Sequence, residues 1–101
     1  MISGPKPKPG TTLNMANYRI STRAKYDLAA IADYTLENFG KTQSRRYSDG
    51  LKLSFQNLSQ HRHLGRKADD LADALRAFDY SSHVIYYLLT DKDILIVRVL
   101  H

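Results

Sequence analysis

Three polar residues lie in stretches of the C-terminal third that otherwise have the apolar pattern of buried β-strands: Arg76, Arg98 and His101. A polar side chain in such a place usually has a bonded partner or a function, because burying it alone is costly. Guanidinium groups can stabilise a developing negative charge, and an imidazole can transfer a proton. We therefore treat these three residues as a candidate effector region, and we assign no catalytic residue from the sequence alone.

Both arginines of this region also have a purely structural interpretation. Arg98 would pair with a carboxylate of the first predicted helix, Asp27 or Asp33, and Arg76 would pair with Asp79 or with a helix carboxylate. Under that interpretation the arginines stabilise the fold, and their loss removes folded protein rather than a specific activity. The sequence leaves both interpretations open.

Metal and cofactor motifs are missing from the sequence. His61 and His63 are two residues apart, but no cysteine and no suitably spaced acid completes a metal site around them. The chain also has no Gly-rich phosphate loop, no HExxH and no GxSxG. We therefore expect no metal and no cofactor, and we interpret the two histidines as solvated loop residues.

The middle of the chain is strongly basic. Residues 41–67 contain seven cations against the single acid Asp49, whereas the whole chain has a formal net charge of +5. Such a concentration favours an acidic protein segment or a nucleic acid as the partner, although a solvated helix surface is the alternative. Our candidate contacts to an acidic partner are Arg45, Lys52 and Arg66.

The first residues differ in composition from the rest. Residues 1–14 hold all three prolines, which alternate with two lysines over residues 5–9, a pattern that resists both helix and strand. This composition predicts a flexible leader, followed by a single domain at residues 15–101. The chain has no apolar run long enough to span a membrane and no apolar signal segment at its start, so the cytoplasm is the expected compartment.

Two amphipathic helices are predicted after the leader. The first carries an apolar stripe at helical spacing, formed by Ala24, Leu28, Ile31, Thr35 and Phe39. Ser21 or Thr22 is placed to cap its start and Gly40 to end it. The second begins at Thr42, and its stripe is formed by Tyr47, Leu51, Phe55 and Leu58. The short link between the two helices predicts an antiparallel hairpin.

Four strands complete the predicted fold, one before the helices at residues 18–20 and three after them at 75–80, 84–90 and 94–100. The last strand is apolar on both faces apart from Arg98, so we expect it to be central or covered on both sides. The residues between the second helix and the second strand, 61–74, are predicted to form a loop. The order predicts an α+β, two-layer β-α-α-β-β-β domain in which an N-terminal helical hairpin packs on an antiparallel sheet.

Short stretches of this sequence occur in the order and spacing of a known family. They are Ile20-Ser21 with Ala24 and Asp27-Leu28, then Ile31, Tyr34 and Phe39-Gly40, then Leu64-Gly65-Arg66, Leu75-Arg76, Ser82 to Tyr87, and Ile96 to His101. Together they resemble the ParE-type toxins of the RelE/ParE toxin superfamily over nearly the whole domain. The fold that this resemblance implies agrees with the order of elements predicted from periodicity.

The resemblance also implies a function. ParE-type toxins belong to type II toxin–antitoxin systems, including plasmid stabilisation systems, and act on DNA gyrase without being enzymes; a ParD-type antitoxin neutralises them. The resemblance therefore implies that this chain inhibits DNA gyrase. The antitoxin contacts would include Arg45, Lys52 and Arg66, and the effector region would lie near the C-terminal end.

Two alternatives remain open. RNA-cleaving relatives of the RelE type act on ribosome-bound mRNA, and such a chemistry would use Arg76, Arg98 and His101 to stabilise a phosphorane and to move the proton of the 2′-hydroxyl. Family members usually continue past the terminal Val-Leu-His, whereas this chain ends at His101. The second alternative is therefore a non-toxic remnant that still binds antitoxin. The sequence identifies neither the antitoxin nor the oligomeric state.

Overall fold

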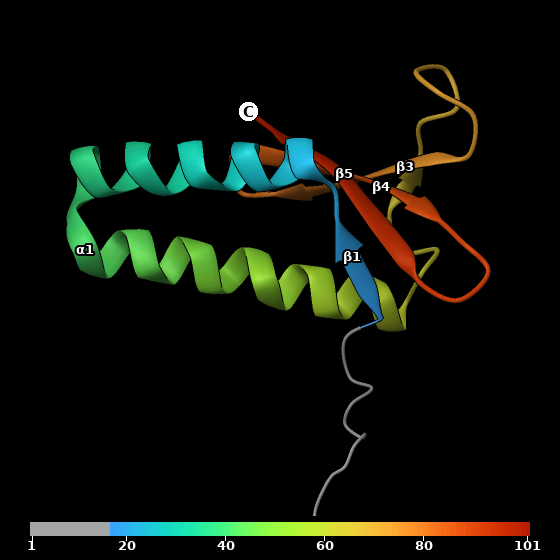
Figure 1. Cartoon of the computed structure of the whole chain (residues 1–101), viewed down its shortest axis with the longest axis horizontal. Coiled ribbons are helices and arrows are strands. Elements are labelled where there is room, and N and C mark those ends of the chain that lie inside the picture. Colours follow the sequence, from blue (N-terminus) through green and yellow to red (C-terminus); the bar gives the residue numbers. More distant parts are fainter. Residues whose placement is uncertain (1–16) are drawn as a thin grey trace, which may run out of the picture.

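The computed structural model describes residues 17–101, and the predicted leader at 1–14 lies outside them. The described residues form an α+β fold in which one helical element packs on a five-stranded sheet (Figure 1). Its elements are β1 (Tyr18–Ile20), α1 (Thr22–Gln60), β2 (Arg66–Lys67), β3 (Leu75–Tyr80), β4 (His83–Leu89) and β5 (Ile94–Leu100). The predicted α+β class and its two layers are confirmed.

One helical element replaces the two separate helices of the sequence prediction. α1 runs from Thr22 to Gln60, and Gly40 interrupts it with φ 87° and ψ 173°, a conformation that only glycine adopts readily. The chain folds back at this residue, so that the two arms of α1 lie side by side (Figure 1). Thr35 on the first arm donates its hydroxyl to Ser44 Oγ on the second at 3.1 Å. The predicted separate start at Thr42 is therefore not observed.

Ser21 joins the start of α1 to the sheet. Its hydroxyl oxygen accepts the backbone N–H of Ala24 at 3.0 Å, which is the predicted N-cap. The same hydroxyl donates to the carbonyl of Val97 at 3.0 Å, and the backbone N–H of Ser21 donates to the carbonyl of Ile96 at 2.9 Å. The helix therefore begins directly against the last strand.

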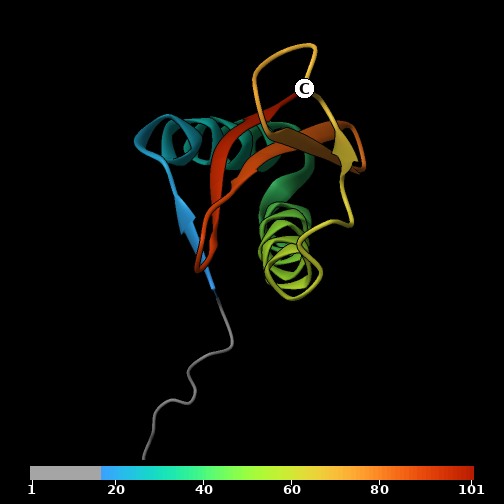
Figure 2. The same cartoon turned by 90° about the vertical axis from the view of Figure 1, so that its right-hand side faces the viewer.

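The sheet is mixed rather than antiparallel, which corrects the sequence prediction. Its strand order is β1-β5-β4-β3-β2, with β1 parallel to β5 and the other neighbours antiparallel. Figure 2 shows β1 and β3 on opposite sides of the two long strands. A parallel pair needs a long crossover connection, and the whole of α1 together with three strands provides one here. The expected interior place of β5 is confirmed.

The predicted loop at 61–74 contains a short strand. Residues Arg66 and Lys67 of β2 pair with Ala77 and Arg76 of β3. Two polar residues carry no alternating apolar pattern, so periodicity could not detect this strand. β2 thereby covers part of the outer edge of β3.

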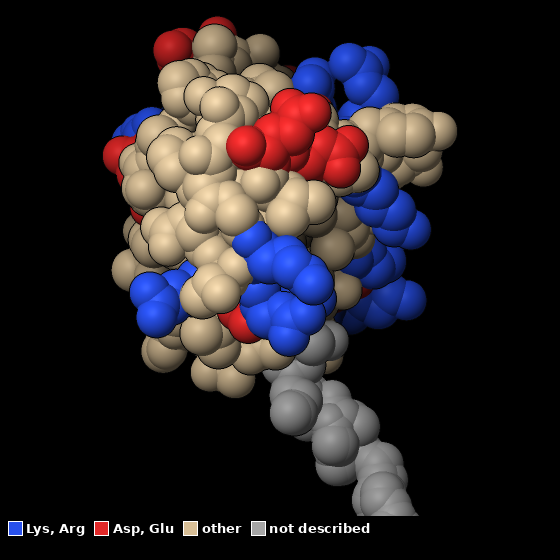
Figure 3. Space-filling view, turned by 90° about the vertical axis from the view of Figure 1, so that its left-hand side faces the viewer, with Lys and Arg blue, Asp and Glu red and all other residues tan. Residues whose placement is uncertain are grey.

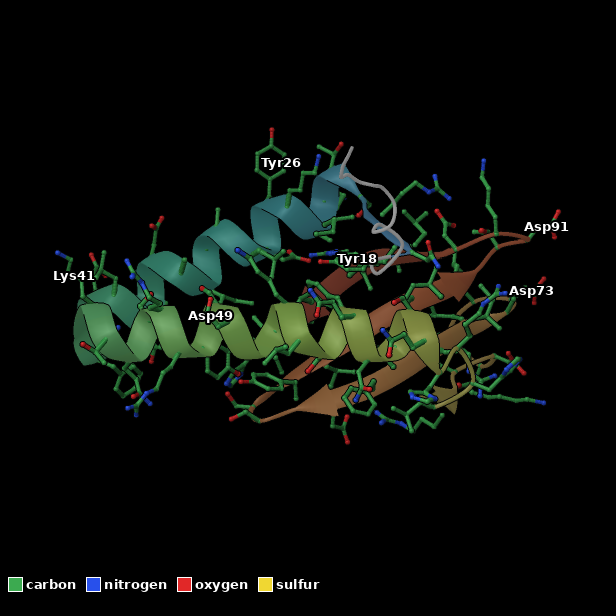
Figure 4. The ribbon with its side chains drawn as sticks, turned by 90° about the horizontal axis from the view of Figure 1, so that it is seen from below. Tyr18, Tyr26, Lys41, Asp49, Asp73 and Asp91 are labelled. Atoms are coloured by element: carbon green, nitrogen blue, oxygen red, sulfur yellow. The ribbon has the colours of Figure 1, made fainter. Side chains whose placement is uncertain are left out.

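The main core lies between α1 and the sheet. It is formed by Ala24, Ile31, Leu51, Phe55, Leu58, Ile85, Tyr87, Ile94, Ile96 and Val99. Tyr18 packs its ring edge-on against Phe55, with centroids 5.6 Å apart, between the helical layer and the sheet (Figure 4). The predicted core position of Phe39 is wrong, because its side chain is 62% exposed. It directly precedes the bend of α1, which lies beyond the strands (Figure 1).

Within residues 17–101, no helix combines the length and the apolar character that a membrane crossing requires.

The second arm of α1 offers a matched test of this packing. Leu51 is 2% exposed in the core, whereas Leu53, two residues later, is 64% exposed. We expect Leu51→Ala to lower the free energy of unfolding by about 2–5 kcal/mol, because it leaves a cavity against the sheet. Leu53→Ala should change it by less than about 0.5 kcal/mol. Urea unfolding followed by circular dichroism measures both, and equal losses would contradict the assignment of this helix face.

Candidate functional site

Arg98 is held by a carboxylate of α1. Its Nε and Nη2 donate to Asp27 Oδ2 and Oδ1 at 2.8 and 3.0 Å, and Asp27 Oδ2 also accepts the backbone N–H of Val99 at 2.9 Å. The hydrogen bond from Arg98 lowers the pKa of Asp27 against the opposing effect of burial, and the bond from Val99 adds to the lowering. One of the two pairings foreseen for Arg98, that with Asp27, is therefore present, and Arg98 links β5 to the helical layer.

Arg76 serves a different part of the fold. Its Nη2 donates to the carbonyls of His63 and Gly65 at 3.0 and 2.7 Å, and its Nε donates to Gly65 at 3.0 Å. The pairing of Arg76 with Asp79 is not observed, because Asp79 instead accepts a hydrogen bond from Arg66 at 2.9 Å. Arg76 thus fixes the segment that precedes β2.

Tyr87 fixes the same segment from the core. Its hydroxyl accepts the backbone N–H of Gly65 and donates to the carbonyl of Arg62, both at 2.9 Å. A Cβ on Gly65 would lie 2.7 Å from this hydroxyl and 2.9 Å from the carbonyl of Ala77, so only glycine fits without a shift. Tyr87 is fully buried.

His101 lies against a histidine that the sequence analysis did not select. The rings of His83 and His101 meet edge to face with centroids 5.3 Å apart. Tyr47 Oη lies 2.6 Å from His83 Nδ1, which joins the second arm of α1 to β4. Burial, and next the neighbouring His101, lower the pKa of His83. One sequence signal for a polar partner such as His83 was Tyr47, because a tyrosine on a predicted buried face needs a polar partner for its hydroxyl.

A groove of about 730 Å³ opens beside this histidine pair. It lies between the first arm of α1 and the end of β5, and its lining includes Tyr34, Phe39, Tyr47, His83 and His101. Tyr34 and Phe39 are 60% and 62% exposed, and their rings meet with centroids 6.4 Å apart. Exposed aromatic side chains beside an apolar hollow are typical of a surface that binds another protein.

The charges around this groove limit its chemistry. In the described chain no lysine or arginine contributes to its lining, and its one acidic side chain, Asp27, is already bonded to Arg98. A phosphate placed here would find no guanidinium or ammonium group in contact with it. The groove of the described chain is therefore suited to apolar side chains rather than to RNA.

The three residues of the candidate effector region are not brought together. Arg76 is bonded to the segment before β2, Arg98 to α1, and only His101 lines the groove. Within residues 17–101, no group of three or more acids and histidines is placed to hold a metal ion.

The basic residues of the middle segment are also dispersed. Arg45 and Lys52 are exposed on the second arm of α1, whereas Arg66 lies on β2 in an exposed ion pair with Asp79. Figure 3 shows one acidic cluster and several groups of basic side chains over the end of the molecule where α1 bends. On this face the basic side chains are therefore divided into several groups.

Comparisons with known proteins agree with the fold and the resemblance. A family model described as "ParE toxin of type II toxin-antitoxin system, parDE" matches residues 18–101. Toxin ParE1 of Caulobacter vibrioides is 32% identical over 87 residues, which cover 86% of this chain and 90% of that protein. A chain of the solved chromosomal ParDE TA system from P. aeruginosa matches with a TM-score of 0.73 and 18% identity, over 86% of this chain and 96% of that chain. At that identity the structural likeness concerns the fold alone.

The ion pair of Asp27 predicts a pH dependence of stability. The folded pKa of Asp27 is lowered from 3.8, so its contribution is present above about pH 4 and is lost as the pH falls through the folded value. We expect Asp27→Asn to lower the free energy of unfolding at pH 7 by about 1–2 kcal/mol and to reduce the loss of stability below pH 4. Asp33→Asn, an exposed site on the same arm, is the control. Thermal melts from pH 7 to pH 2 measure both, and parallel curves for Asp27→Asn and the parent would contradict the assignment.

Proposed function

Because the chain belongs to the family of ParE toxins of type II toxin–antitoxin systems, we propose that it inhibits DNA gyrase and that a ParD-type antitoxin neutralises it. The family match at residues 18–101, which spans nearly every described residue, is the observation that carries this proposal. The inhibition is non-enzymatic, since it needs contacts with gyrase and no chemistry of the toxin's own.

The groove supports the antitoxin part of the proposal. A segment with several apolar side chains would cover Tyr34 and Phe39, which are exposed in the chain alone. Such aromatic residues at the centre of an interface often carry a large share of the binding free energy. The antitoxin accordingly contributes an amphipathic segment whose apolar side chains enter the groove.

The exposed cations have a separate role in this proposal. Arg45 and Lys52 stand clear of the groove lining and attract an acidic segment of the antitoxin, which raises the association rate more than the affinity. Arg66 contributes less, because it already shares an exposed ion pair with Asp79.

The effector region is reduced to one residue that is free to contact gyrase. Arg76 and Arg98 are committed to bonds within the fold, so their first role is to hold the segment before β2 and the end of β5 in place. His101 is exposed at the end of β5 and is the contact that we propose for the target.

Gyrase inhibition is tested with the purified full chain, gyrase and a relaxed plasmid. We expect loss of supercoiling and accumulation of cleaved plasmid in proportion to the toxin, and relief of both by the ParD-type antitoxin encoded beside it. His101→Ala should reduce the cleaved fraction without a matching loss in melting temperature. Cleavage of mRNA in a translation reaction, with gyrase unaffected, would instead mark an endoribonuclease of the RelE type. Inactivity in both reactions with antitoxin binding retained would mark a non-toxic remnant.

The antitoxin surface is tested with two exposed tyrosines of the same helix arm. Tyr34 lines the groove, whereas Tyr26 is 70% exposed and points away from the sheet (Figure 4). We expect Tyr34→Ala to weaken binding of the ParD-type antitoxin at least about tenfold, which corresponds to about 1.4 kcal/mol. Tyr26→Ala should leave the affinity unchanged. Calorimetric titration measures both, and equal affinities for the two variants would place the antitoxin elsewhere.

A further inference from the structure

The histidine pair occupies one end of the groove floor. His83 begins β4, and the register that pairs Val84 with Leu100 places His101 next to His83 on the neighbouring strand. Their rings meet edge to face at 5.3 Å with an interplanar angle of 76°. Both rings line the groove, so the protonation of either one changes the charge of the surface that a bound segment would contact.

Few groups around the pair can balance a positive charge. Tyr47 and Asp27 line the same groove from α1, and the ring of Tyr80 on β3 packs against Tyr47. Asp27 already accepts hydrogen bonds from Arg98 and from the backbone of Val99. Among the residues that line the groove in the described chain, no other acidic side chain is present to pair with an imidazolium.

Tyr47 couples the protonation of His83 to the groove wall. In the tautomer in which the hydroxyl donates to His83 Nδ1, a proton added at that nitrogen forces the hydroxyl to turn and accept. The carbonyl of Tyr80 lies 3.5 Å from the same hydroxyl and is the acceptor to which it can then turn. A second proton on His101 would place two like charges in contact, which is strongly unfavourable at this distance.

We propose that the His83–His101 pair is a pH-sensitive element that keeps the groove uncharged and open to an apolar segment at neutral pH, and that its protonation in mild acid expels that segment. The identity of the segment as part of a ParD-type antitoxin rests on the proposed function. The behaviour of the histidine pair in the toxin alone does not depend on that proposed function.

The sign of the effect follows from linkage. The pKa of His83 is already below its ordinary value of 6.5 through burial and through His101. An apolar segment in the groove removes more water from the ring and lowers this pKa further, so binding releases protons. The affinity therefore falls as the pH drops through the pKa of the free toxin, by at most about tenfold per pH unit for each histidine involved.

The first experiment uses the full-length toxin alone. Nuclear magnetic resonance of the imidazole nitrogens from pH 8 to pH 4.5 follows all four histidines. We expect the pKa of His83 to lie below its ordinary value of 6.5, and His101→Asn to raise it. A pKa of His83 at or above 6.5, or no response to His101→Asn, would overturn the proposal. The pKa of His83 is measured in the parent protein, so the proposal can still be tested if the variant fails to fold.

The second experiment measures binding of the ParD-type antitoxin encoded beside the toxin, by calorimetry at pH 7.5, 6.5 and 5.5. The affinity of the parent should fall over this range, by less than about tenfold, because one proton with a pKa below 6.5 is involved. The double variant His83→Asn/His101→Asn should lose most of that dependence, while His61→Asn/His63→Asn keeps it. An unchanged dependence in the first double variant would overturn the proposal. Absence of binding at every pH would refute the proposed antitoxin, and the titration of the toxin alone would still decide the role of the histidine pair.

Discussion

The carboxylate of Asp27 joins the two layers of this fold. β1 pairs with β5 only as far as Ile96, and beyond that point the edge of β5 has no neighbouring strand. Ser21 and Asp27, at the start of α1, take over this edge by bonding the carbonyl of Val97 and the N–H of Val99. The same carboxylate binds Arg98, so the first arm of α1 is fixed against the last strand, and the position of that arm defines one wall of the groove.

In this arrangement the apolar groove and the exposed cations belong to different surfaces of the protein. Because Asp27 and Arg98 neutralise each other, the groove that they border has no unpaired lysine, arginine or acidic side chain in its described lining. The free cations, such as Arg45 and Lys52, stand on the outer side of the second arm. A partner that binds here can therefore be attracted from a distance by one surface and held by another, two steps that respond differently to salt.

The sequence predicted what periodicity and capping can specify. The bounds of β1, β3 and β5 and the buried stripe around Leu51 and Phe55 match the structure, because each depends on the local composition and spacing of apolar residues. The parallel pairing of β1 with β5 depends on the path of the whole chain and carries no local signal. The bonding partners of Arg76 and Arg98 have no complete local signal for a related reason: the polar residues can be recognised in the sequence, but their partners depend on how distant segments meet.

If the surface proposed to bind the antitoxin overlaps the surface proposed to contact gyrase, the antitoxin can neutralise the toxin without a separate inhibitory site. His101 closes one end of the groove and is also the exposed polar residue at the end of β5. If the antitoxin fills the groove as proposed, it covers His101 and excludes any target that needs this residue. A fold does not by itself determine an activity, so activity must depend on such surfaces and not on the arrangement of strands. In this chain the committed bonds of Arg76 and Arg98 leave the end of β5 as the place where antitoxin and target would compete.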